Sequence, residues 1–219
     1  MEISGIFWHK LPVFHWRHVV AVLFLLCLFS GHPAWAAQKT VLVLGDSLSA
    51  GYGLEKGTGW VDLLGKRLKK DYPEITIVNA SISGDTSSGG RARLPALLKR
   101  YAPTVVVIEL GANDGLRGFP VKSIYDNLLA MVEMVKKQKG TVLLLGMQIP
   151  PNYGQAYTRD FAGVYSALAK KGKVSLVPFF LKGVAERDDL FQSDNIHPVA
   201  EAQPVMLDNV WPFLEPLLK

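Results

Sequence analysis

Cysteine and histidine are the residue types that this sequence nearly lacks. The only cysteine is Cys27, and four of the five histidines precede residue 33. If residues 1–36 are removed as a leader, the remaining chain has no thiol, which excludes disulfides and thiol chemistry. It keeps one histidine, His197. A metal site built from several imidazoles is therefore not expected, and any mechanism that needs a histidine has one candidate.

A long apolar run of membrane-spanning length is also missing. Lys10 and Arg17 precede an apolar run over residues 19–29, and Ala34-Trp35-Ala36 ends the stretch with the small-x-small pattern of a cleavage site. A span needs about 20 apolar residues. We expect a signal peptide over 1–36, cleavage after Ala36, and a periplasmic or secreted domain over 37–219 without a stable membrane span. An uncleaved anchor is the alternative.

The net charge of the chain is small and positive. The whole chain carries a formal charge of +5, and residues 37–219 carry +4 because the leader holds two basic residues and one acidic residue. Lys66, Arg67, Lys69 and Lys70 lie near the end of one expected helix, where cations suit the helix dipole. A solvated helix surface explains these charges better than nucleic-acid binding, so no nucleic-acid partner is expected.

The residues that follow the leader alternate between strand-like and helix-like patterns. Runs rich in β-branched residues indicate strands, whereas apolar residues such as Trp60, Leu64 and Leu68 recur at helical spacing. Alternation of this kind favours βαβ units and a parallel sheet covered on both faces. We predict a single three-layer α/β/α domain with a closing helix near 200–218, whose course Pro204, Pro212 and Pro216 leave open. The five expected strands are 40–45, 75–79, 104–109, 141–146 and 174–177.

The first expected strand leads directly into a polar turn. Four apolar residues, 41–44, precede Gly45-Asp46-Ser47. In open α/β sheets, ligands bind beyond the carboxyl ends of the strands, so Ser47 stands where a nucleophile would be useful. The alternative is that Asp46 and Ser47 only cap the next turn.

Two further loops follow the second and third strands and so lie on the same edge of the sheet. They are Asn79–Thr86 and Gly111–Gly115, and each mixes glycine with serine, asparagine or aspartate. Ordinary turn chemistry explains any one of them. Three such loops on one edge favour a functional site.

The single histidine of residues 37–219 lies close to an acidic residue. Asp194 and His197 are three residues apart in Asp194-Asn195-Ile196-His197-Pro198. A carboxylate that holds one imidazole nitrogen leaves the other free as a base, which is the arrangement that activates a serine. The alternative is that His197 merely precedes a helix.

Other catalytic patterns are absent from the sequence. There is no Gly-x-Ser-x-Gly nucleophile elbow. Gly51, Gly53, Gly57 and Gly59 fit neither the dinucleotide fingerprint nor the phosphate-loop spacing. No cluster has metal-ligand spacing. We therefore expect neither a metal nor another cofactor.

In combination, these motifs resemble the SGNH (GDSL-type) hydrolase family. The resemblance covers nearly all of residues 40–215, in order, and Ala112 departs from it where relatives often have glycine. It rests on Gly45–Tyr52, Asn79–Ser87, Arg93–Lys99, Gly111–Gly118, Pro151–Gly154 and Ile196–Pro198.

The resemblance implies a flavodoxin-like fold and a serine hydrolase. Ser47 would be the nucleophile, His197 the base and acid, and Asp194 the orienting carboxylate. The oxyanion hole would comprise the Ser47 N–H, the Gly84 N–H and the Asn113 amide. Substrates would be small acyl esters and thioesters, including aryl esters and lysophospholipids. Candidate walls of an acyl groove, which are equally explained as loop anchors, are Leu116, Phe119, Ile149, Pro150 and Tyr153.

Three other functions stay open at this point. A carbohydrate O-deacetylase would use the same site for acetyl esters. A non-catalytic exported binding protein would keep the fold but not react with phosphonates. A nucleotide- or flavin-binding domain would share the fold, although the glycine pattern for phosphate binding is missing.

Overall fold

The described part of the computed structural model comprises residue 1 and residues 39–219, so the expected signal peptide lies outside the described residues. Residues 39–219 form one α/β domain. Its centre is a five-stranded parallel sheet of order β2-β1-β3-β4-β5, which confirms the expected sheet. The strands are β1 Thr40–Gly45, β2 Thr76–Asn79, β3 Val105–Glu109, β4 Thr141–Leu145 and β5 Ser175–Val177.

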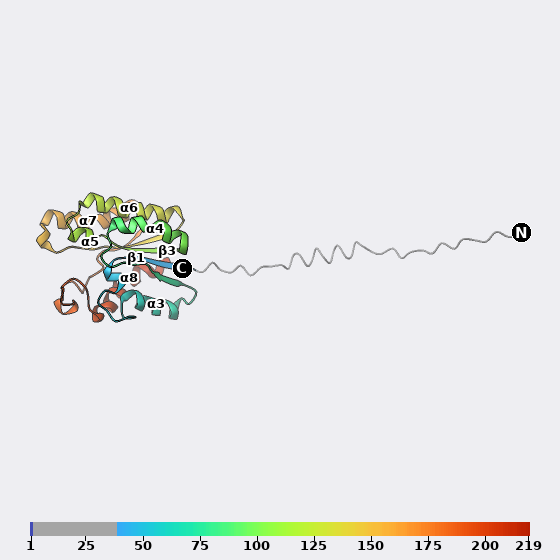
Figure 1. Cartoon of the computed structure of the whole chain (residues 1–219), viewed down its shortest axis with the longest axis horizontal. Helices are drawn as coiled ribbons and strands as arrows, with labels where there is room; N and C mark the ends of the chain where they lie inside the picture. The colour runs from blue at the N-terminus through green and yellow to red at the C-terminus, as the bar shows by residue number, and fades with distance from the viewer. Residues whose placement is uncertain (2–38) are drawn as a thin grey trace. The chain divides into compact units, whose positions relative to one another are not determined.

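The central strands are apolar because both faces of the sheet are covered. Residues 41–44 of β1 and 105–108 of β3 are almost entirely inaccessible to solvent, as expected for a parallel sheet between two helical layers. In Figure 1, α4, α6 and α7 lie on one side of the sheet, and α3 and α8 lie on the other. The longer helices are α3 Trp60–Asp71, α4 Ser87–Tyr101, α6 Val121–Lys137, α7 Gln155–Gly172 and α8 Gln203–Leu214.

The helical stripes in the sequence do face the core. Trp60, Leu64 and Leu68 of α3 are buried, which confirms the expected spacing, and Ile124, Leu128, Met131 and Val135 of α6 form a second buried stripe. The closing helix α8 is shorter than expected, because 3-10 turns flank it at Ala200–Ala202 and Glu215–Leu217. Two prolines fit these ends: Pro204 lies in the first turn, where the missing N–H is tolerated, and Pro216 lies in the final 3-10 turn.

Short elements follow the strands at the carboxyl edge of the sheet. The single-turn helix α2 Ser47–Ala50 follows β1, and α5 Ala112–Leu116 follows β3. The 3-10 turns Pro151–Tyr153 and Asp188–Leu190 lie in the connections after β4 and β5. Among the described residues, no helix is long and apolar enough to cross a membrane.

Candidate functional site

Ser47 stands at the first position of the helical turn α2, directly after β1. The Asp46 side chain caps this turn, because its Oδ1 accepts a hydrogen bond from the Leu48 N–H at 3.1 Å. Asp46 therefore caps the turn as the alternative expects, but its other oxygen binds Asn113, and both Asp46 and Ser47 line a cavity. Gly45 makes the arrangement possible, since a Cβ there would lie 2.7 Å from both Glu109 and Ser49.

The chain brings Ser47, His197 and Asp194 together. His197 Nε2 lies 2.9 Å from Ser47 Oγ, and His197 Nδ1 lies 2.6 Å from Asp194 Oδ2. Asp194 Oδ1 also accepts the N–H groups of Ile196 and His197 at 2.9 and 3.0 Å. The hydrogen bond from His197 and these two backbone bonds lower the Asp194 pKa to about 2. The carboxylate therefore stays charged beside the imidazole at neutral pH.

The loop that carries His197 is held in place by its own ends. Phe191 and Pro198 form an antiparallel bridge, and the Gln192 N–H donates to the His197 carbonyl at 2.8 Å. On the outer side, the Tyr52 ring packs against the imidazole with the centroids 4.4 Å apart and the planes tilted by 39°. The sequence did not single out Tyr52, because its contact with His197 depends on a loop that only the fold places.

Two residues that line the cavity, Ser47 and Gly84, have backbone N–H groups without a protein acceptor among residues 39–219. Gly84 takes a left-handed conformation with φ of 78° that few other residues adopt. Both donors are thus available to a ligand atom.

Asn113 lies at the same site, but its amide is already engaged. Its Nδ2 donates to Asp46 Oδ2 at 3.0 Å and to the Asp85 carbonyl at 2.9 Å. A primary amide has two hydrogens, and both have acceptors here. Asn113 can therefore serve a third acceptor only by sharing or exchanging one of these bonds.

Arg93 ties the loop after β2 to the end of β1. Its guanidinium forms an ion pair with Asp85 at 2.8 Å and donates to the carbonyl oxygens of Ala80 and Gly45. Because Asp85 follows Gly84 and its carbonyl binds Asn113, Arg93 fixes the position of the loop that carries the Gly84 donor.

Three carboxyl groups are buried around the site. They belong to Asp46, Glu109 and Asp114, each at most 2% exposed. Burial is the largest cause that raises the pKa of Asp46, to about 6. Burial and then the neighbouring Asp46 raise the pKa of Glu109 well above its ordinary value. Asp114 belongs to the Gly111–Gly115 loop that the sequence pattern singled out, but Glu109 is a single acidic residue at the end of an apolar strand, and no motif marks it.

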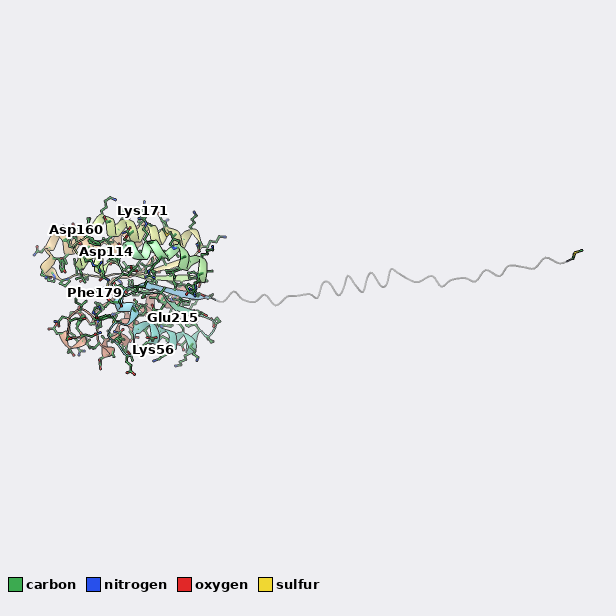
Figure 2. The ribbon with its side chains drawn as sticks, viewed as in Figure 1. Lys56, Asp114, Asp160, Lys171, Phe179 and Glu215 are labelled. Atoms are coloured by element: carbon green, nitrogen blue, oxygen red, sulfur yellow. The ribbon has the colours of Figure 1, made fainter. Side chains whose placement is uncertain are left out.

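Asp114 has a structural role. It accepts the Ser87 N–H at 2.8 Å and the Ser87 hydroxyl at 2.6 Å, both at the first residue of α4. A carboxylate at a helix N-terminus is favourable because it faces unpaired N–H groups and the positive end of the dipole. Asp114 lies on the α4, α6 and α7 side of the sheet (Figure 2) and joins α5 to α4.

A cavity of about 730 Å³ opens beside Ser47. Phe179, one of its wall residues, lies at the end of the molecule away from Glu215 (Figure 2). Two carboxylates, Glu186 and Asp188, also line it. Most of the wall is apolar, formed by Leu48, Leu116, Met147, Ile149, Pro150, Pro151, Phe179, Leu181, Ala185, Phe191 and Ile196.

The candidate groove residues divide into two groups. Leu116, Ile149 and Pro150 line the cavity as expected. The assignment of Phe119 and Tyr153 to its wall is wrong, because neither lines it and both are partly exposed. Instead, the Tyr153 hydroxyl donates to the Leu116 carbonyl, and the Phe119 carbonyl accepts the Tyr157 hydroxyl. These contacts anchor the loop behind the wall, which was the alternative considered for them.

Comparisons with known proteins match nearly all of this domain. Residues 43–203 match the model of the GDSL-like lipase/acylhydrolase family. Esterase TesA of Pseudomonas aeruginosa is 54% identical over 84% of this chain and 91% of its own. Thioesterase 1/protease 1/lysophospholipase L1 of Escherichia coli is 42% identical over 94% of this chain and 95% of its own. A crystal structure of TesA, 53% identical, superposes with a TM-score of 0.80 over 82% of this chain and 99% of that one.

The contact between Asp114 and Ser87 generates a stability prediction. Ser87→Ala removes the hydroxyl donor from a buried carboxylate, so the free energy of unfolding should fall by about 1–3 kcal/mol. Urea unfolding monitored by circular dichroism measures it. Ser166→Ala is the matched control, because Ser166 is exposed and bonds only locally; it should change stability by less than about 0.5 kcal/mol. Equal midpoints for the two variants would contradict the prediction.

Proposed function

Because the chain belongs to the GDSL-like lipase/acylhydrolase family, we propose that it is a serine hydrolase that cleaves carboxylic esters and acyl thioesters through an acyl-enzyme on Ser47. The observation that carries the proposal is the continuous chain of contacts from Asp194 through His197 to Ser47 at the mouth of an apolar cavity.

In the first half of the reaction, His197 Nε2 takes the proton of the Ser47 hydroxyl while Ser47 Oγ bonds to the carbonyl carbon. A serine is a weak nucleophile at neutral pH and needs such a base. The tetrahedral intermediate then collapses, the bond to the leaving alcohol or thiol breaks, and His197 gives that group its proton. Asp194 keeps its charge throughout and stabilises the imidazolium.

In the second half, a water molecule replaces the leaving group. His197 takes a proton from the water as its oxygen attacks the acyl-enzyme, and then returns a proton to Ser47 as the carboxylic acid departs. The oxyanion of both tetrahedral intermediates would lie among the Ser47 N–H, the Gly84 N–H and the Asn113 amide. Donors fixed where charge develops stabilise the transition state more than the substrate. No step needs a metal or another cofactor.

The cavity suggests what the acyl group looks like. Its volume of about 730 Å³ and its mostly apolar wall suit an alkyl or aryl chain better than an acetyl group. We therefore propose small-molecule acyl esters and thioesters as substrates, lysophospholipids among them. The names arylesterase and lysophospholipase L1 belong to relatives 44% and 42% identical, and they support this range.

We also propose that residues 1–36 act as a secretory signal peptide and that residues 37–219 work in the periplasm or outside the cell. The support is the order of basic residues, apolar run and Ala34-Trp35-Ala36 in the sequence.

The first prediction for this function concerns Ser47. A fluorophosphonate probe should label residues 37–219 on Ser47, as located by mass spectrometry, and Ser47→Ala should abolish both labelling and hydrolysis of p-nitrophenyl esters. Rates across acetate to dodecanoate should favour the longer chains. A preference for acetate would support the O-deacetylase instead, and an absence of labelling in folded protein would support a binding protein.

A second prediction concerns the carboxylate that orients His197. In Asp194→Asn, the amide oxygen would stay on the two backbone N–H groups and the amide nitrogen would face Nδ1. That arrangement favours a proton on Nε2, which then cannot accept from Ser47. We expect kcat to fall roughly 10³–10⁴-fold with little change in KM, measured at pH 7 to 9. A loss smaller than about tenfold would argue against this role.

A third prediction concerns the side-chain donor. Asn113→Ala should lower kcat about 10²–10³-fold with the fold intact, the usual effect of losing one oxyanion donor. Asn127→Ala is the matched control, because that amide lies on α6 and bonds Ser87 outside the cavity; it should keep kcat within about threefold. If Asn113→Ala retains activity within about tenfold, Asn113 is not part of the oxyanion hole.

A further inference from the structure

Glu109 is a fully buried carboxyl group that the reaction does not use. It ends β3 directly beside Gly45 and is 0% exposed, and Asp46, one residue before the nucleophile, is 1% exposed. Within residues 39–219, neither carboxyl group forms an ion pair. Two adjacent buried carboxylates without a cation are strongly unfavourable when both are charged. One of the pair is therefore expected to hold a proton.

The contacts of Glu109 indicate which one. Its Oε2 accepts the Ser49 hydroxyl at 2.8 Å and the Asp46 N–H at 3.2 Å. The Ser49 oxygen in turn accepts from the Trp60 indole at 3.2 Å, which fixes the direction of the hydroxyl. The other oxygen, Oε1, is buried and has no donor among the described residues. A carboxylate with an unpaired buried oxygen is costly, whereas a protonated carboxyl group has a hydrogen of its own to give.

Asp46 has the opposite set of contacts. Its two oxygens accept from the Leu48 N–H and from Asn113 Nδ2, so each oxygen has a donor, whereas both donors to Glu109 lie on Oε2. A donor on each oxygen favours the charged form of Asp46. The shift directions agree, because burial raises the pKa of Glu109 well above the usual range, whereas bonds from Leu48 and Glu109 restrain the rise at Asp46.

We propose that Glu109 is a positioning residue of the oxyanion hole: in its protonated form it donates to Asp46, which holds one hydrogen of the Asn113 amide and leaves the other for the oxyanion. This inference rests on the proposed function. It also accounts for how Asn113 can donate to the oxyanion although both of its amide hydrogens already have acceptors. With Asp46 fixed by Glu109, the hydrogen directed at the Asp85 carbonyl is the one that the oxyanion shares.

The shared proton also limits the negative charge near the reacting atoms. A pair that carries one charge rather than two repels the developing oxyanion less. The other titratable groups that interact with the pair are His197, whose charge opposes the rise that burial causes in the Asp46 pKa, and Tyr165, whose pKa burial and then the pair raise. Of these, only His197 becomes cationic, and it does so as the oxyanion forms.

Substitutions at Glu109 test whether it acts through Asn113. Glu109→Gln keeps the shape, an acceptor for Ser49 and a donor for Asp46, so kcat should stay within about threefold of the parent. Glu109→Leu loses the donor, so kcat should fall about tenfold or more while KM changes little. In the Asn113→Ala background the same Leu substitution should change kcat by less than about twofold, because residues that act as a unit are not additive. Glu133→Gln, an exposed carboxyl group on α6, is the matched control.

Infrared spectroscopy tests the proton directly and does not depend on activity. The difference spectrum between the parent protein and Glu109→Gln at neutral pH should contain the carbonyl stretch of a neutral, buried carboxylic acid, and the Glu133→Gln difference should not. Absence of that band would overturn the proposal, as would equal effects of Glu109→Leu in both backgrounds. If the Leu variant does not fold, the Gln variant and the band decide. Failure of Ser47 to label would refute the proposed function and leave the band unaffected.

Discussion

The parallel pairing of β1 with β3 is the constraint on which the rest of the site depends. Gly45 pairs with Glu109 at the carboxyl ends of these strands, and the absence of a side chain at Gly45 leaves the space that Glu109 and Ser49 occupy. The turn that presents Ser47 begins two residues later, and the turn that presents Asn113 begins three residues after Glu109. A register shift of one residue would separate the two turns. The backbone therefore sets the distance between Ser47 and the Asn113 amide.

The site separates its carboxyl groups by environment. Asp194 lies at the surface, where three hydrogen-bond donors keep it ionised beside His197. Asp46, the residue before Ser47, and Glu109 are shielded from water, and burial raises both pKa values. Asp114 is also buried, and its carboxyl group accepts the N–H and hydroxyl of Ser87 at the N-terminus of α4. The same functional group thus binds an imidazole, accepts from an amide and joins two helices, and the different environments come from hydrogen bonding and access to water.

The sequence predicted the strands and most helical faces because two-sided burial makes the sheet apolar throughout, as in residues 105–108. It also placed the loops of Ser47 and Asn113 on one edge of the sheet and indicated His197 as the base, since His197 is the single histidine of residues 37–219. Glu109 could not be recognised, because its importance depends on the register with Gly45. Tyr52, Phe119 and Tyr153 were equally hard to assign. Whether such a ring contacts the imidazole, lines the cavity or anchors a loop is decided by tertiary packing, which local pattern does not encode.

Ser47 and His197 are separated by 150 residues along the chain. This separation affects the order in which the two side chains reach their final positions during folding. Ser47 is placed by β1 and its neighbours in the sheet, whereas the loop of His197 follows the last strand and is fastened by contacts that form within residues 190–198. Pairings so distant in sequence close late in folding. A chain whose C-terminal quarter has not yet docked would hold Ser47 without His197. Under the proposed mechanism, catalytic turnover would therefore report the finished tertiary structure, and a partly folded chain would not react with the esters and thioesters around it.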